Sequence, residues 1–381
     1  MPVPGVTPFS ISVPDEDLDD LRRRLRATRW PDRATVGDWS QGVPLDYLQE
    51  LCRYWADEYD WSARQARLNG VEQFTTELDG LPIHFLHARS PHPGALPLLL
   101  THGWPGSVAE FLDVLGPLTD PAAHGGDPAD AFTVVVPSLP GFGWSGKPTA
   151  PGWGLERVAD AWAELMTRLG HQRFGAQGGD LGSFVSANLA ARHPDRLAGI
   201  HLNMVVSPPP ADRTEFTDRE ERGRRAEQHF RTVDSAYNMQ QRTRPQTLAY
   251  GLADSPAGQC AWILEKFWSW SDCAGDPVAA LGADRILDQV STYWFTDSAG
   301  SSARMYWEMA RSPASRAPVV AVPTGVSLFP HDILQPTEEW ARGQYTDLRL
   351  WREHERGGHF AAMEQPDLLV GDVREFFRPL R

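Results

Sequence analysis

Runs of consecutive apolar residues alternate with segments of helical periodicity through the middle of the chain. Residues 96–100 and 132–136 are continuous apolar runs, which is the pattern of strands buried on both faces of a sheet. They are followed by a helical pattern at 155–169, a strand at 173–177, a helix at 184–193 and a strand at 197–203. This alternation predicts an α/β fold, with a mostly parallel sheet and helices on both of its faces.

Further strands flank this part of the chain. Residues 74–78 and 82–87 alternate in polarity and are joined by Asp79-Gly80, which predicts a hairpin. Strand patterns resume at 319–328 and 348–354, and residues 367–377 predict a closing helix.

Two regions do not show the strand–helix alternation. Residues 1–70 contain two amphipathic helical patterns, one of them marked by Leu18, Leu21 and Leu25. Residues 208–312 contain charged and aromatic helical patterns without a clear strand. We therefore predict an N-terminal helical meander (1–70) packed on the core, a core in two parts (71–207 and 313–381), and a helical cap (208–312) inserted after the sixth strand.

The composition of the chain disfavours some classes of binding partner and indicates a cellular compartment. The 381 residues are 41% hydrophobic and carry a formal net charge of −14, which disfavours nucleic acid and anionic membranes as partners. The three cysteines form no CxxC pair, and no apolar stretch approaches the roughly 20 residues of a membrane span. No signal-peptide pattern is present at the N-terminus, so we expect a cytoplasmic protein without a membrane partner.

One short turn carries the main chemical signal. Gly178-Gly179-Asp180-Leu181-Gly182-Ser183 lies between a predicted strand and a predicted helix, which is the setting of a nucleophile elbow. The glycines are expected there because a Cβ atom would not fit against so tight a turn. The nucleophile position holds Asp180, and a carboxylate nucleophile forms an ester with the carbon it attacks. This residue predicts attack on an sp³ carbon.

A base and an orienting acid are expected after the nucleophile in the chain. Gly357-Gly358-His359-Phe360 supplies the base, because its glycines let the loop bring His359 close to Asp180. His354 is a weaker competitor at the end of the preceding strand. Asp332 follows the strand 319–328 and is the predicted acid, in preference to Glu338 and Glu339 further along the chain.

Two loops are candidate binding elements. His102-Gly103-Trp104-Pro105 follows a buried strand, so the N–H groups of Trp104 and Leu181 are the predicted oxyanion donors, and a cis bond before Pro105 is expected. Residues 141–146 match GxGxxG, but a Pro-rich stretch follows where a nucleotide site needs a helix. No metal-ligand spacing is present either, so we predict no cofactor and no metal.

The leaving oxygen needs a proton donor other than the base. A phenol is a suitable acid for an alkoxide. The cap contains Tyr237, Tyr250, Tyr293 and Tyr306, and the pattern alone does not choose among them.

These motifs together resemble the microsomal-type epoxide hydrolases, a branch of the α/β-hydrolases. The resemblance includes the motifs His102–Ser107, Ser138–Gly143, Gly178–Asp180 and Gly357–Phe360, and a segment from Pro8 to about Asn69 similar to that branch's N-terminal meander. It implies an α/β-hydrolase fold, and it implies that Tyr237 and Tyr306 hold the epoxide oxygen. Family members carry Glu or Asp at the acid position, which here is Asp332.

The resulting hypothesis is hydrolysis of an epoxide to a vicinal diol through an ester on Asp180, later cleaved by water that His359 activates. The aromatic cap favours an apolar or aromatic epoxide, with Trp104, Trp262 and Trp294 as substrate-binding residues. The resemblance further implies a role in natural-product biosynthesis, of the enediyne-antibiotic type, or in xenobiotic detoxification, and a homodimer.

Two alternatives stay open. A dehalogenase uses the same Asp–His–acid set, but it needs halide-binding donors and commonly an indole where this chain has Leu181. A non-catalytic binding protein of the same fold would be expected to lack at least one of Asp180, His359 and Asp332.

Overall fold

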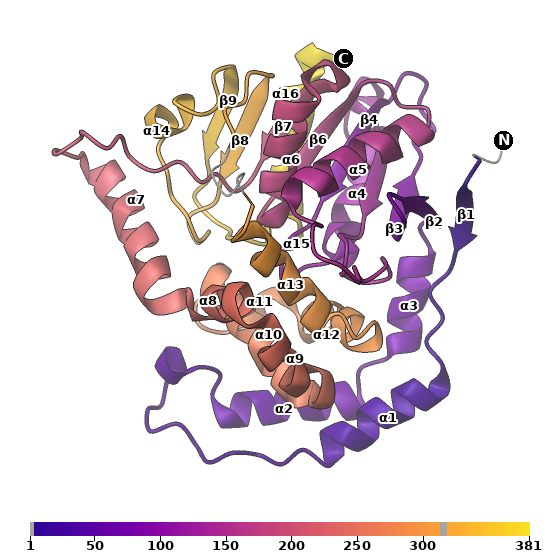
Figure 1. Ribbon diagram of the computed structural model, residues 1–381, viewed down its shortest axis with the longest axis vertical. Helices are drawn as coiled ribbons and strands as arrows, with labels where there is room; N and C mark the ends of the chain where they lie inside the picture. Colours follow the sequence, from indigo (N-terminus) through magenta and orange to yellow (C-terminus); the bar gives the residue numbers. More distant parts are fainter. Residues whose placement is uncertain (1–3, 313–317) are drawn as a thin grey trace.

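A single mixed sheet organises the computed structural model, which describes residues 4–312 and 318–381 (Figure 1). Within these residues the sheet has nine strands in the order β1-β2-β3-β5-β4-β6-β7-β8-β9. The strands are β1 (Val6–Phe9), β2 (Gln73–Leu78), β3 (Leu81–Ala88), β4 (Leu96–Thr101), β5 (Phe132–Pro137), β6 (Phe174–Gly178), β7 (Leu197–Leu202), β8 (Thr324–Leu328) and β9 (Leu348–Glu353). The strands from β5 to β9 in this order are parallel, and β1, β2 and β3 are antiparallel additions at one end. The predicted α/β-hydrolase fold is confirmed.

The first strand was not predicted. Val6 pairs with Thr76, so β1 extends the hairpin of β2 and β3 at the edge of the sheet. Its four residues include Pro8, which an edge strand tolerates because one of its sides needs no ladder hydrogen bond. A strand so short and interrupted by proline gives little alternation to detect. As a result, the helical insertion follows the seventh strand and not the sixth.

Two pairs of helices pack on the two faces of the parallel strands. The pair α5 (Leu155–Arg168) and α6 (Leu181–Arg192) covers one face, and the pair α4 (Leu112–Thr119) and α16 (Pro366–Phe377) covers the other (Figure 1). Alternate residues of β4 point to opposite faces. Leu99 belongs to the apolar cluster under α5 and α6, whereas Leu98 and Leu100 belong to the cluster under α4 and α16. Two short helices, α14 (Glu338–Arg342) and α15 (Ala361–Glu364), complete the C-terminal part.

Residues 208–312 are helical and contain no strand in the described structure. Their helices are α7 (Asp218–His229), α8 (Ala236–Thr243), α9 (Pro245–Asp254), α10 (Pro256–Trp270), α11 (Pro277–Leu281), α12 (Ala283–Phe295) and α13 (Ala299–Met309), with a π-helical segment (Phe230–Asp234) before α8. Figure 1 shows α8 to α13 gathered below the sheet, between it and the N-terminal helices. None of the described helices is both long and apolar enough to cross a membrane.

The N-terminal segment, predicted to pack on the core, contacts the helical insertion in addition. It contains α1 (Asp15–Arg26), α2 (Leu45–Asp57) and a third helix that was not predicted, α3 (Trp61–Asn69). β1 joins the sheet, but α1 and α2 contact α10 of the helical insertion, and they run along its far side in Figure 1. The segment therefore contacts the insertion as well as the core.

Candidate active site

Asp180 occupies a strained turn between β6 and α6. Its φ of 48° and ψ of −126° lie in a region that residues other than glycine rarely adopt. A Cβ atom on Gly182 would lie 1.9 Å from the carbonyl oxygen of Thr101, and one on Gly178 would lie 2.3 Å from the backbone of Gly182. The expected steric reason for these glycines is confirmed, and the turn holds the Asp180 carboxylate at the carboxyl end of the sheet.

The loop after β4 donates directly to this carboxylate. The backbone N–H of Trp104 lies 2.8 Å from Oδ1 of Asp180, and the Trp104–Pro105 peptide bond is cis, as predicted. Leu181 is the first residue of α6, where a backbone N–H has no partner within the helix. The two predicted oxyanion donors thus lie on either side of Asp180.

His102 holds the Trp104 loop in place. Burial lowers the pKa of His102 to about 4, so its ring is neutral at pH 7. Its Nε2 accepts the Leu139 N–H at 3.1 Å, which leaves Nδ1 to donate to the Gly103 carbonyl at 3.0 Å. The ring thereby joins the loops that follow β4 and β5.

His359 lies between two carboxylates. Its Nε2 is 3.6 Å from Oδ2 of Asp180, and its Nδ1 is 2.7 Å from Oδ1 of Asp332. All three residues are buried. The competing His354 is engaged elsewhere, because its Nε2 lies 2.6 Å from Oδ2 of Asp372. The structure therefore brings together Asp180, His359 and Asp332 as a connected set.

The two carboxylates control the charge of His359. Burial lowers the pKa of His359, but the charges of Asp332 and Asp180 outweigh burial and raise this pKa to about 10. The ring is consequently an imidazolium at neutral pH.

Two of the four candidate tyrosines lie against the Trp104 ring. Tyr237 of α8 stacks on this indole with centroids 4.8 Å apart, and Tyr306 of α13 meets it edge-on at 6.1 Å. The two phenol rings are 5.8 Å apart and buried. Burial and the Asp180 charge raise both phenol pKa values well above the ordinary value of 10, so both phenols keep their protons. The two phenol hydroxyls interact with each other, and the Tyr306 hydroxyl forms no hydrogen bond of standard geometry with the described residues.

The other two tyrosines lie outside this pair. Tyr250 is 72% exposed on α9. The Tyr293 hydroxyl donates to the Gly106 carbonyl at 2.9 Å and so has a structural partner.

Two predicted aromatic residues are not brought to Asp180. Trp262 lines a separate cavity between α10 and the N-terminal segment and donates to Gln241 at 3.2 Å. Trp294 lies 5.9 Å from the guanidinium of Arg24 on α1. The sequence pattern placed both in the insertion, but it did not show that these rings turn toward the N-terminal helices.

Trp270 occupies the position beside the cluster instead. Its ring lies 5.0 Å from the His359 ring and 5.2 Å from Tyr237, and its carbonyl accepts the His359 N–H at 2.8 Å. Behind it, the buried Lys266 Nζ lies 2.8 Å from Asp234 and 4.8 Å from the Tyr237 ring centre. The sequence signal was a lysine at an apolar position of α10, in a chain that otherwise relies almost wholly on arginine.

Comparison with known proteins identifies the family of this chain. The sequence profile of the epoxide hydrolase N terminus matches residues 6–111, and that of the alpha/beta hydrolase fold matches residues 97–242. Epoxide hydrolase 1 of Oryctolagus cuniculus is 35% identical over 98% of this chain and 88% of its own length. The chain belongs to the epoxide hydrolase family.

Other members of the epoxide hydrolase family are similar over the same length. A protein of Stigmatella aurantiaca whose name assigns it provisionally to the epoxide hydrolases is 55% identical over 99% of this chain and 86% of its own. The structure of Aspergillus niger epoxide hydrolase superposes with a TM-score of 0.89 at 34% identity, covering 98% of this chain and 96% of that one. The protein is thus an enzyme, an epoxide hydrolase, and acts on ether bonds.

Proposed function

We propose that this epoxide hydrolase opens its substrate through an ester on Asp180, with His359 and Asp332 as the base and its orienting acid. The observation that carries the proposal is the position of His359, whose two ring nitrogens lie 3.6 Å and 2.7 Å from the two carboxylates. The Asp180 carboxylate lies on a strained turn, where it can reach a ligand. The Asp332 carboxylate lies on the other side of the His359 ring.

In the first step, a carboxylate oxygen of Asp180 attacks an epoxide carbon. The carbon–oxygen bond of the ring breaks, and Tyr237 and Tyr306 donate hydrogen bonds and a proton to the departing oxygen. Their raised pKa values keep both phenols protonated, and a protonated phenol is the form that can serve as the acid. The product of this step is a glycol monoester of the enzyme.

Ester formation also prepares the second step. It removes the negative charge of Asp180, one of the two charges that raise the His359 pKa. That pKa then falls, and the proton that His359 releases replaces the one that the phenol gave to the departing oxygen, so the phenol is restored and His359 becomes a neutral base. It takes a proton from water, and the water oxygen bonds to the Asp180 carbonyl carbon. The N–H groups of Trp104 and Leu181 stabilise the oxyanion, and cleavage of the ester bond releases the diol.

The rings beside the reacting groups favour an apolar or aromatic epoxide. The walls next to the reacting groups are the rings of Trp104, Tyr237 and Trp270, which contact one another. Aromatic walls favour ligands that bury apolar surface. Two phenol donors suit an oxygen leaving group, which needs a proton, better than a halide, which needs none.

Trapping of the ester tests the proposal. His359→Gln, incubated with styrene oxide, is expected to gain the mass of one substrate on the peptide that contains Asp180, because hydrolysis stops while attack continues. Asp180→Ala is expected to gain no mass and to lose turnover. Absence of the adduct in His359→Gln, in protein that is folded, would refute the ester mechanism.

The expectations of a cytoplasmic homodimer and of a role in natural-product biosynthesis or detoxification are further proposals. Light scattering of the purified protein tests whether it is a homodimer. A screen of styrene-oxide-like and bulkier aromatic epoxides, with chiral analysis of the diols, tests the substrate class on which the second depends.

A further inference from the structure

A small cavity adjoins Asp180 on the side of His359. Its volume is about 20 Å³, enough for the centre of one water molecule but not for an organic ligand. Its polar walls are the side chains of Asp180, His359, Asn203 and Glu110. The Oδ1 atom of Asn203 accepts a hydrogen bond from Gln177 at 2.8 Å, which leaves its NH₂ group for other partners.

Glu110 has no role in the chemistry described above. It lies in the short 3₁₀ helix η2 (Val108–Phe111), directly after the loop that carries Trp104. Its Oε2 lies against Gly106, where an added Cβ atom would come within 2.1 Å of it. The carboxyl group is therefore folded back over the oxyanion loop, toward the cavity that it lines together with Asp180 and His359.

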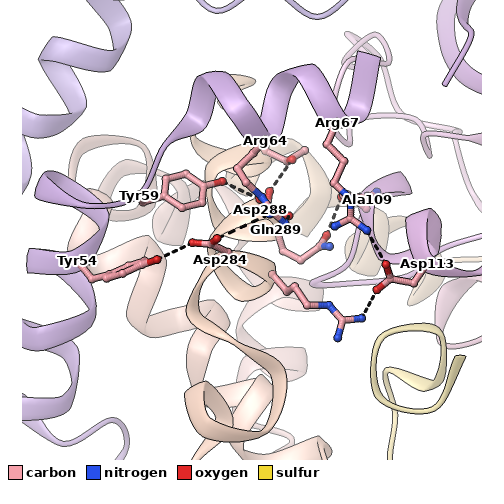
Figure 2. A network of polar contacts seen from close by, with 12 residues as sticks. Tyr54, Tyr59, Arg64, Arg67, Ala109, Asp113, Asp284, Asp288 and Gln289 are labelled. Carbon is pink, nitrogen blue, oxygen red and sulfur yellow. Dashed lines mark hydrogen bonds and ion pairs between the residues drawn. The ribbon is translucent and has the colours of Figure 1, made fainter. Parts of the chain in front are cut away.

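Contacts on both sides of Glu110 fix its position. Before it, the Ser107 hydroxyl donates to Oε1 of Gln289 on α12 at 2.6 Å. After it, Asp113 forms an ion pair with Arg67 of α3 (Figure 2). Asp113 also forms an ion pair with Arg285 of α12. The segment that presents Glu110 is thus held by the insertion and the N-terminal segment together, which fixes the backbone from which the carboxyl group extends.

We propose that Glu110 is a catalytic residue that binds and orients the water which hydrolyses the Asp180 ester. This inference rests on the proposed function. The water occupies the small cavity, donates one O–H to the Glu110 carboxyl and directs the other to Nε2 of His359. Its oxygen then bonds to the Asp180 carbonyl carbon while that second proton passes to His359, and the alcohol oxygen leaves with the proton that His359 returns.

The protonation of Glu110 agrees with this role. Burial raises the pKa of Glu110 to about 8, with His359 lowering it and Asp180 raising it to a smaller extent. The group is therefore largely a neutral carboxyl at pH 7, which can accept a hydrogen bond without adding a second anion beside the nucleophile. An ionised group there would repel Asp180 as it attacks the epoxide.

Pre-steady-state kinetics with styrene oxide separate the two steps. In Glu110→Leu we expect the rate of ester formation to stay within about threefold of the unmodified enzyme. We expect ester hydrolysis to slow by about tenfold or more, the effect of losing one buried hydrogen bond to the reacting water. The ester then accumulates and is visible by mass spectrometry. Glu110→Gln keeps a carbonyl acceptor of the same shape and should restore most of the hydrolysis rate.

Glu364→Gln is the matched control, because Glu364 is also a partly buried carboxyl near His359, with its pKa raised by burial to about 7. Its oxygens accept the N–H groups of Asp272 and Phe360, so it is expected to change both steps alike. Should Glu110→Leu fail to fold, Glu110→Ala takes its place. Equal effects on both steps, or unchanged hydrolysis, in the Glu110 variants would overturn the inference while leaving the ester mechanism standing. Absence of any ester, including in His359→Gln, would instead refute the proposed function.

Discussion

The Nδ1 atom of His359 lies 2.7 Å from Oδ1 of Asp332, so Nε2 is the ring nitrogen that faces Asp180. The same Asp332 oxygen accepts the N–H of Ile333 at 2.7 Å, which fixes the carboxylate. Both side chains are buried, so their interaction is not weakened by solvent. Asp332 therefore sets the orientation of the base and stabilises its charged form.

Replacement of Asp332 tests this relationship. We expect Asp332→Asn to lower the rate of ester hydrolysis by about 10²-fold to 10⁴-fold, since a neutral amide neither holds the correct tautomer nor stabilises the imidazolium. Ester formation should fall less. Single-turnover kinetics measure both steps, and Asp332→Glu should recover part of the loss. Equal loss in both steps would mean that Asp332 serves the fold and not the base.

The two buried phenols are expected to act in the first step. Tyr237→Phe and Tyr306→Phe should each slow ester formation by about 10-fold to 100-fold, because each removes one hydrogen bond of about 1–3 kcal/mol from the departing oxygen. The double variant should lose almost all activity. Stopped-flow tryptophan fluorescence can follow this step, given the rings that surround the site. Tyr250→Phe, at an exposed position, is the control and should behave as the unmodified enzyme.

The ion pairs between the N-terminal segment and α12 are expected to contribute to stability. Asp288 accepts hydrogen bonds from the Tyr59 hydroxyl at 2.9 Å and from Nε of Arg64 at 2.8 Å (Figure 2). The side chains of Arg64 and Asp288 are only 18% and 6% exposed. We expect Asp288→Asn to lower the free energy of unfolding by about 2–4 kcal/mol, because it leaves a largely buried guanidinium with only the more distant Asp284 carboxylate, at 3.7 Å, as counter-charge. Denaturant titration measures this quantity.

An exposed ion pair provides the comparison. Arg33 and Asp46 are 67% and 65% exposed, so Asp46→Asn should cost less than about 1 kcal/mol. Similar losses for Asp46→Asn and Asp288→Asn would contradict the role assigned to burial.

Four buried histidines predict loss of stability in acid. Burial lowers the pKa of His84 to about 3 and those of His87, His102 and His201 to about 4. Between these values and about 6.5, the unfolded chain binds more protons than the folded protein, so stability falls as pH decreases through this range. Each histidine contributes up to about 1.4 kcal/mol per pH unit to the slope.

Unfolding free energies measured from pH 7 down to pH 5 test this slope. In a His201→Gln variant, the unfolding free energy should fall less steeply with decreasing pH. The slope should be smaller by up to about 1.4 kcal/mol per pH unit, the contribution of one histidine. His124, which is exposed, can be replaced in the same way to control for the substitution itself. A slope unaffected by His201→Gln would show that this ring does not titrate on unfolding.

The nucleophile turn and the base were predictable because local chemistry demands particular residues there. Glycines at 178 and 182 leave room for backbone atoms that would otherwise clash, and such a requirement is visible in sequence. The strand β1 was missed because four residues with a proline carry almost no periodic signal. The pairing that makes it a strand comes from β2, about 70 residues away in the chain.

Side-chain directions in the helical insertion were less predictable. The sequence places tryptophans 262, 270 and 294 on helices, but only tertiary packing decides that Trp270 faces His359 while the other two rings face the N-terminal segment. Aromatic residues have the same helical pattern whether they line a site or fill a core. For the same reason, pattern alone did not choose Tyr237 and Tyr306 among four tyrosines.

The sequence by itself determined the alternation of strands and helices, the carboxylate at the sharp turn and the histidine that follows the last strand. These depend on residue types at short spacings, where backbone sterics and chain order leave few choices. Only the tertiary structure decided which two tyrosine rings contact the Trp104 ring. It also decided that Glu110 lines a water-sized cavity together with Asp180 and His359. Those contacts join segments far apart in the chain, and their geometry depends on how helices pack rather than on any local pattern.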